Sequence, residues 1–205
     1  MDPLAEKYPN ISPYAYVLNN PVNAIDPDGR KIVFAKGVSK EFKKAFAMAI
    51  KHLKANKADG VFAKLQARKE TFTIEEVKAD GYFDPNTKTI GWDPNVGLLT
   101  DEGVVISATT ILNHEGDHAL QQVENLKQKE IDLANTNVGD YDNNEEKRVI
   151  DGSEQRTAKA LGEIKDGEVT RKNHRGDLIE TTSPTSNNLK NEVIIIVPKK
   201  ETNDK

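Results

Sequence analysis

The stretch Ile111–Leu120 reads Ile-Leu-Asn-His-Glu-Gly-Asp-His-Ala-Leu, which is His-Glu-x-x-His inside an apolar frame. In a helix, positions i and i+4 share one face, so His114 and His118 can direct two imidazoles at one metal ion. Glu115 can then take a proton from a metal-bound water, the arrangement typical of zinc hydrolases. The alternative is a surface helix with two incidental histidines. It is disfavoured because the chain has only 4 histidines and two stand at ligand spacing.

Apolar residues on both sides of the motif predict a buried helix. We expect it to begin at about Asp101 or Val104 and to end at about Lys127, because Asp101 and Glu102 suit the positive end of a helix. The flanking apolar positions are Val104, Val105, Ile106, Ala108, Ala119, Leu120 and Val123.

The composition limits the other possibilities. The 205 residues suffice for one domain with a real core. A net charge of −4 gives no reason to expect nucleic acid as a partner, and no apolar run approaches membrane-spanning length. Residues 1–7 do not have the pattern of a signal peptide. Because cysteine is absent, any metal must be held by His, Asp and Glu.

A catalytic zinc site needs a third protein ligand. After His118, no third histidine follows at the short spacing used by metzincins, and Glu124 comes too soon on the same helix. We therefore expect a carboxylate from a second helix. The candidates are Glu145, Glu146 and Glu154.

The second helix is predicted from about residue 144 or 145 through Leu161, with Gly162 ending it. Gly152 is expected to kink or split this helix, with Ser153 as a new N-cap. Residues 133–144, just before it, read as a polar loop.

The remaining segments predict a mixture of strands and helices. Strands are expected at 31–35, 71–77, 88–92 and 193–197, and helices from Ser39 and over about 59–68. Thr89–Asp93 is the candidate for an edge strand that pairs with an extended substrate. Alternatively, it is an ordinary sheet strand with Trp92 in the core. After Glu163 the chain is polar and turn-rich.

The N-terminal residues 2–30 contain Asp-Pro-Leu-Ala-Glu-Lys-Tyr, Ser-Pro-Tyr-Ala-Tyr, Asn-Asn-Pro and Asp-Pro-Asp-Gly in that order. This pattern closely resembles the end of the core domain of Rhs/YD-repeat proteins, where it closes a large β-cage that precedes a variable C-terminal toxin. The resemblance implies that the domain from Lys31 onward is a polymorphic toxin or effector.

Residues 144–152, Asn-Glu-Glu-Lys-Arg-Val-Ile-Asp-Gly, resemble the Glu-Glu-x-Arg/Tyr-Thr-Phe/Ile-x-Gly stretch of clostridial neurotoxin light chains and type III effector metallopeptidases. The resemblance implies that Glu145 ligates zinc, with Glu146 or Arg148 supporting it. Val149 replaces the family's threonine. A further resemblance of residues 153–163 to the effector family keeps Glu154 as the alternative ligand.

Residues 171–176, Arg-Lys-Asn-His-Arg-Gly, resemble the Arg-x-x-Tyr of the neurotoxins and, more closely, the Arg-x-x-His-x-Gly of the effectors. The resemblance implies that Arg171 and His174 face the zinc and stabilise the oxyanion of the tetrahedral intermediate. A charged surface loop is the alternative. Asp117 is expected either to orient an imidazole or to face solvent.

These patterns together predict an α+β fold of zincin-like metallopeptidase type, with the active-site helix packed on a second helix beside a small mixed sheet. The expected divisions are an Rhs-core remnant at 1–30, the peptidase domain at 31–198 and a disordered tail at 199–205.

The expected function is zinc-dependent cleavage of a protein substrate by a toxin that is secreted or delivered into a target cell. The expected partners are a cognate immunity protein and the Rhs cage of a longer parent chain. The alternatives are a non-catalytic binding module with a degenerate site, or a zinc hydrolase of non-peptide amides.

Overall fold

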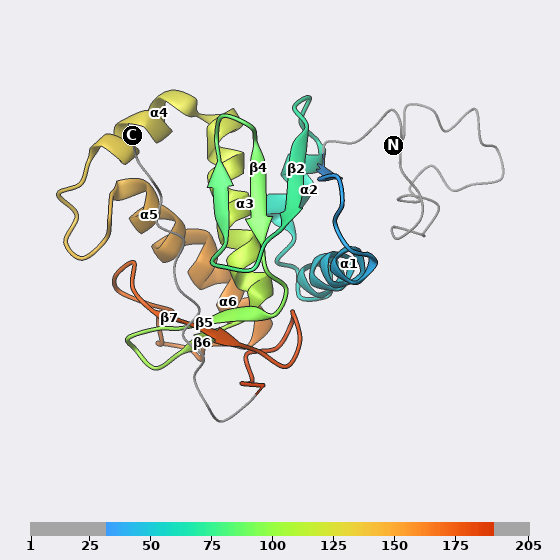
Figure 1. The fold of residues 1–205 in the computed structure, drawn as a ribbon. Helices are drawn as coiled ribbons and strands as arrows, with labels where there is room; N and C mark the ends of the chain where they lie inside the picture. The colour runs from blue at the N-terminus through green and yellow to red at the C-terminus, as the bar shows by residue number, and fades with distance from the viewer. Residues whose placement is uncertain (1–31, 191–205) are drawn as a thin grey trace.

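Helix α3 (Ala108–Glu124) carries the His-Glu-x-x-His motif, with one small sheet along its length and a second near its N-terminal end (Figure 1). The computed structural model describes residues 32–190, and these form a mixed α+β fold, as predicted. The predicted arm at 1–30, strand at 193–197 and tail at 199–205 lie outside the described residues. None of the helices within 32–190 combines the length and the apolar character needed to traverse a bilayer.

The first sheet has the strand order β1-β2-β4-β3. Its strands are β1 (Ile32–Phe34), β2 (Phe72–Glu76), β3 (Tyr82–Asp84) and β4 (Thr89–Trp92). β1, β2 and β4 are parallel, whereas β3 runs antiparallel to β4 at the end of the sheet opposite β1. The prediction that Thr89–Asp93 is an edge strand is therefore wrong, because β4 has a partner on both sides. The edge strands among residues 32–190 are β1 and β3, and β3 is the one that contacts α3.

Helix α1 (Lys40–Ala55) covers this sheet through the apolar face that its sequence predicts. Ser39 caps the helix, because its Oγ accepts a hydrogen bond from the backbone N–H of Phe42 at 2.9 Å. Phe42 and Phe46 pack against Trp92, which is fully buried. The indole N–H of Trp92 donates to the carbonyl of Ala108 at 2.7 Å, which ties β4 to the first residue of α3.

The short helix α2 (Gly60–Gln66) lies directly against α3, and Gly116 allows this close approach. A Cβ at Gly116 would lie 3.1 Å from side-chain atoms of both Val61 and Phe62. The first variable position of His-Glu-x-x-His is therefore filled by a residue that permits helix packing.

The second sheet was not predicted. It has the order β6-β5-β7 and is antiparallel, with strands β5 (Val96–Leu99), β6 (Val105–Ile106) and β7 (Asp177–Glu180). The predicted start of the motif helix at Asp101 or Val104 is wrong, because residues 101–104 form a turn and the strand β6 follows at Val105–Ile106. α3 begins only after Ser107, whose Oγ accepts from the N–H of Thr110 at 3.3 Å.

The predicted C-terminal end of the motif helix is also corrected. α3 ends at Glu124, and Asn125 caps a new helix, α4 (Leu126–Ala134), by accepting from the N–H of Gln128 at 3.4 Å. α4 takes up the start of the segment expected to be a polar loop.

The second helix of the prediction is present over the expected residues. α5 (Asn144–Val149) continues through a π-helical turn at Ile150–Glu154 into α6 (Gln155–Leu161). Gly162 ends it in the left-handed conformation, with φ of 77°. The helix does not split at Gly152, and the hydroxyl of Ser153 does not cap a new helix.

Glu163 gives a stability prediction. Its Oε2 accepts from the hydroxyl of Thr110 at 2.7 Å, while its Oε1 is buried without a hydrogen-bond partner among residues 32–190. Burial raises the pKa of Glu163 to about 6, although hydrogen bonds from Ser107 and Thr110 oppose the shift. Because the folded state binds this proton more tightly than the unfolded state, the protonated carboxyl stabilises the fold. This contribution to the unfolding free energy is lost as pH rises through about 6.

We therefore expect Glu163→Gln, which cannot ionise, to gain stability relative to the parent protein as pH rises. The difference in unfolding free energy should shift in favour of the variant by about 2 kcal/mol between pH 4.5 and pH 7.5. Urea unfolding of both proteins at the two pH values measures it. An unchanged difference would contradict the buried, ionisable state of Glu163.

Candidate metal centre

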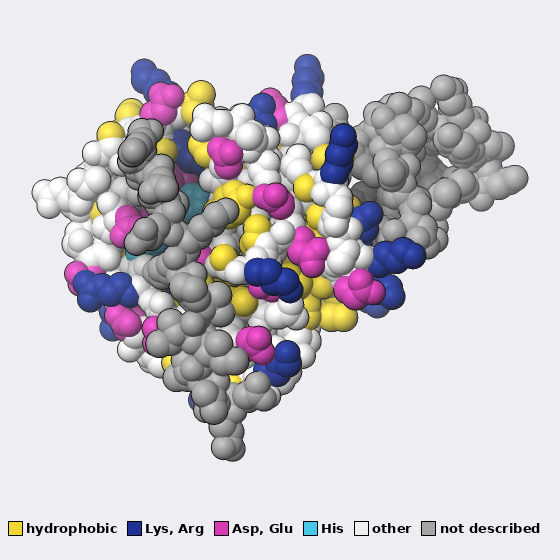
Figure 2. Space-filling model, viewed as in Figure 1, with side chains coloured by type: hydrophobic (Ala, Val, Ile, Leu, Met, Phe, Trp, Pro, Cys, Tyr) yellow, Lys and Arg dark blue, Asp and Glu magenta, His cyan; other side chains and the backbone are white. Residues whose placement is uncertain are grey.

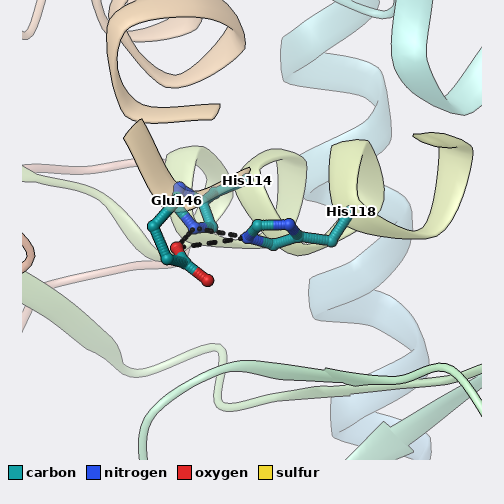
Figure 3. Close-up of side chains that lie close together, drawn as sticks. All are labelled: His114, His118 and Glu146. Atoms are coloured by element: carbon teal, nitrogen blue, oxygen red, sulfur yellow. Dashed lines mark hydrogen bonds and ion pairs between the residues drawn. The ribbon is translucent and has the colours of Figure 1, made fainter. Parts of the chain in front are cut away.

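His114, His118 and Glu146 bring three metal-binding atoms together (Figure 3). The two histidine Nε2 atoms lie 3.1 Å apart, and Glu146 Oε2 lies 3.3 Å from each of them. α3 supplies both histidines and α5 supplies the carboxylate. The side chains are 4%, 8% and 17% exposed, respectively, so a metal held there would be screened from bulk water on most sides.

This triangle has the dimensions of a tetrahedral zinc site. With Zn–N and Zn–O bonds near 2.0–2.1 Å, two ligand atoms at corners of a tetrahedron lie about 3.3–3.4 Å apart. Two imidazoles and one carboxylate are a donor set of catalytic zinc sites, which keep a fourth position for water or substrate. Within residues 32–190 no other His, Asp or Glu joins this group. The residues present therefore fit zinc.

The third side chain of this group is Glu146, whereas the resemblance implied Glu145 and kept Glu154 as the alternative. Successive residues on a helix point about 100° apart, so Glu145 and Glu146 face different directions. Glu146 reaches the two Nε2 atoms. Glu145 and Glu154 reach the Nδ1 atoms on the other side of the imidazoles.

His118 is held from behind by a buried chain of charges. Its Nδ1 lies 3.0 Å from Glu145 Oε1. Arg148 donates to both oxygens of Glu145, at 2.8 and 2.9 Å, and to Asp117 Oδ2 at 2.9 Å. Ser153 also donates to Asp117, at 2.7 Å. Asp117 is therefore buried and binds Arg148, which in turn holds Glu145; it does not contact an imidazole.

His114 is held by an equivalent pair. Its Nδ1 lies 2.8 Å from Glu154 Oε2, and Arg171 donates to both oxygens of Glu154 at 3.0 and 2.6 Å. Ionised carboxylates only accept hydrogen bonds, so each Nδ1 must donate the proton and each Nε2 is directed to the metal position. A carboxylate behind each histidine is a common support of zinc ligands.

The π-helical turn brings the two supporting carboxylates to the same site. In a regular α-helix of about 3.6 residues per turn, Glu145 and Glu154 would lie on opposite faces, because nine residues separate them. The wider turn at Ile150–Glu154 changes that phase. As a result, Glu154 faces His114 while Glu145 faces His118.

The electrostatics of the network favour a cation. Burial would raise the pKa of Glu145 and of Glu154, but Arg148 and Arg171, together with the histidines, lower both values to about 2. Burial likewise opposes the ionisation of Glu146, but the two imidazoles hold its pKa well below the ordinary value.

The same surroundings attract positive charge to the histidines. Burial lowers the pKa of His114, but hydrogen bonds to Glu146 and Glu154 outweigh it and raise the pKa to about 10. With neutral imidazoles, the four contacting carboxylates and two guanidinium groups leave a net charge of −2. One divalent cation would neutralise it. These groups are Asp117, Glu145, Glu146, Glu154, Arg148 and Arg171.

Glu115 lines the same cleft and is only 9% exposed. Burial raises the pKa of its carboxyl above the ordinary value. Its side chain packs on Gly81, the residue just before β3: a Cβ there would lie 3.2 Å from Glu115 Cγ and 2.8 Å from Ile111 Cγ2. Gly81 therefore leaves the space that Glu115 occupies.

Arg171 and His174 both line the cleft, but their surroundings differ. Arg171 is buried and bound to Glu154. His174 is 31% exposed; its Nδ1 lies 2.7 Å from Asp142 Oδ2 and its Nε2 lies 3.4 Å from Glu146 Oε2. His174 is thus the more accessible of the two beside the candidate ligand.

The cleft around these groups has a volume of about 370 Å³. Figure 2 shows histidine side chains at the surface of the molecule, in the same view as Figure 1. Sequence reasoning did not select four of the residues that line the cleft: Phe83 of β3, Lys129 of α4, Asp80 and Asp142. Nothing in their local sequence marks them, because β3, α4 and two loops bring them to the motif helix.

No protein-family model, no curated protein and no solved structure matches the chain. The site therefore has to be interpreted from its own geometry.

Proposed function

We propose that the protein is a zinc-dependent endopeptidase. The observation that carries the proposal is the triangle of His114, His118 and Glu146, with a buried carboxylate behind each imidazole. Three protein ligands are typical of catalytic zinc, whereas structural zinc is enclosed by four. The cleft beside the triangle is open enough to admit a substrate.

Zinc in such a site activates a coordinated water and polarises a carbonyl oxygen. The protein's own residues supply the rest of the chemistry. Glu115, next to His114 and ionised in the working enzyme, accepts the proton from the attacking water. It then gives this proton to the leaving amine.

Two further side chains take different roles. His174, exposed to the cleft and oriented by Asp142, is the residue we assign to stabilise the oxyanion. Arg171 is a positioning residue, because its guanidinium is bound to Glu154, which in turn orients His114.

The sheet supports cleavage of an extended peptide. β3 is an edge strand of the first sheet, and its residues Tyr82 and Phe83 line the cleft. An extended chain could pair with the outer edge of β3 and so cross the metal position. A zincin-like fold for the domain is supported by three elements: the edge strand β3, the motif helix α3 and the helix α5 that carries Glu146.

The direct test is cleavage of a peptide mixture. Zinc-loaded protein is incubated with a protease digest of a bacterial proteome, and new peptide ends are identified by mass spectrometry. We expect new ends with zinc, none after treatment with 1,10-phenanthroline, and recovery when zinc is restored. Cleavage that survives chelation would contradict the proposal, as would no cleavage by protein shown to hold zinc.

Gly81→Ala tests the placement of Glu115. The added methyl would contact Ile111 and Glu115 too closely, so the catalytic carboxylate should shift. We expect kcat to fall about tenfold to a hundredfold with zinc content unchanged, since small displacements of a catalytic group cost this much. Gly60→Ala is the control, because nothing lies near a Cβ at that position. Equal activity of both variants would place Glu115 outside the reaction.

The proposal includes a biological role as a toxin or effector that is secreted or delivered into a target cell. The resemblance of residues 2–30 to the end of an Rhs core supports this role. It also supports a longer parent chain with an Rhs cage and a cognate immunity protein as partner. Growth arrest on expression in bacteria, relieved by Glu115→Gln, is the expected result; equal arrest by both forms would contradict it.

A further inference from the structure

Lys129 is a buried cation in the cleft wall that the proposed reaction does not use. Lys129 belongs to α4 and is only 4% exposed. Its Nζ donates to the backbone carbonyl of His118 at 2.8 Å and lies 4.6 Å from the centre of the Phe83 ring. Lys129 therefore lies between the motif helix and the edge strand β3.

Within residues 32–190, Lys129 has no carboxylate within ion-pair distance. The nearby Asp132 is engaged elsewhere, because its Oδ1 accepts from Gln128 and Asn144 at 3.1 and 2.7 Å. An ammonium group has three N–H donors, and the carbonyl of His118 uses one of them. Burial of a charge without a paired counter-charge is unfavourable.

The surroundings of Lys129 suit an anion on a short apolar stem. Phe83 and Leu133 line the cleft near it and can contact methylene groups. The charges of the four carboxylates at the metal centre would be balanced by their two arginines together with a divalent cation. A carboxylate would complete the donors of Lys129 with a charge-assisted hydrogen bond.

We propose that Lys129 binds a carboxylate of the substrate and so selects peptides with an acidic group close to the cleaved bond. The inference rests on the proposed peptidase function. The carboxylate is either an Asp or Glu side chain or the C-terminal carboxylate of the peptide, and both present the same group to Lys129.

The test measures binding instead of cleavage, so it can fail independently of the peptidase proposal. The protein is the zinc-loaded full chain with Glu115→Gln. The probes are Ac-Ala-Glu-Ala-NH2, Ac-Ala-Gln-Ala-NH2 and Ac-Ala-Gln-Ala-OH, titrated by NMR. We expect a carboxylate probe to bind roughly tenfold to a hundredfold more tightly than the neutral peptide. A preference for the first probe identifies a side-chain carboxylate, and a preference for the third identifies a C-terminal one.

Variants at Lys129 decide the outcome. Lys129→Met keeps the stem without the charge and should abolish the preference, whereas Lys129→Arg should keep it. Lys127→Met is the matched control, because Lys127 is an exposed lysine on the same helix. Thermal unfolding checks that each variant is folded. Equal binding of all probes to the parent form, or a preference that survives in Lys129→Met, would overturn the inference.

Discussion

Glu115→Gln is expected to abolish peptide hydrolysis while the protein keeps its zinc. Glutamine fills the same space beside Gly81 but cannot accept the proton of the attacking water. Loss of a general base lowers the rate by about 10²–10⁴-fold. Zinc affinity should be nearly unchanged, because Glu115 is not among the three candidate ligands.

The measurement is kcat/KM on one cleaved peptide, with zinc content determined on the same samples. Glu130→Gln is the matched control, since Glu130 is an exposed carboxylate on α4. If Glu115→Gln turned over peptide at the parent rate, the proposed mechanism would be wrong. If it lost its zinc as well, Glu115 would be acting on the metal site rather than on the proton.

Glu146→Ala is expected to weaken zinc binding far more than Glu145→Gln does. Glu146 supplies one of three ligating atoms, whereas Glu145 only orients His118 through its Nδ1. Changes to such supporting groups cost about 10- to 100-fold in metal affinity, so loss of a ligand should exceed that range. Competition with a chromophoric chelator gives both dissociation constants.

The choice of Glu145→Gln keeps the comparison fair. Glu145 is fully buried against Arg148, so glutamine preserves its shape while removing its charge. Glu146 is partly exposed in the cleft and tolerates truncation. The reverse order of affinities would restore Glu145 as the ligand, as the resemblance to the neurotoxin light chains implies.

The two helices that form the site could be predicted from the sequence, because their signals are local. His114 and His118 stand one turn apart within an apolar run, and Gly162 marks the end of the second helix. The ligand on that helix could not be chosen from the pair Glu145 and Glu146. One signal was available: Arg148 stands three residues after Glu145, the spacing of an ion pair on one helix face.

The limits of the motif helix and the second sheet depended on contacts that are distant in sequence. Val105–Ile106 pairs with β5, which also pairs with β7 some 80 residues later, so the β-branched run was assigned to the helix. Ser107 was the usable signal, because serine is a favoured N-cap. Likewise, Thr89–Asp93 lies nearer to the motif in sequence than residues 82–84 do, but β3 pairs antiparallel with β4 and so lies at the edge in its place.

The contacts of Arg171 and His174 could not be predicted from the sequence. Both residues line the cleft. Arg171 is engaged by Glu154, a contact that depends on the π-helical turn, and no sequence pattern foretells that turn. Only the three-dimensional contacts distinguish Arg171, which is bound to Glu154, from His174, which is accessible in the cleft.

X-ray absorption spectroscopy at the zinc edge, on purified protein of measured zinc content, tests the central claim most directly. We predict about one zinc per chain, bound by two imidazoles and by oxygen ligands near 2.0 Å. Glu146→Ala should remove an oxygen ligand or the zinc itself. The two imidazole signals in the spectrum should come from His114 and His118. Absence of zinc after supplementation, or a spectrum that lacks two imidazoles, would contradict a catalytic zinc site in this cleft.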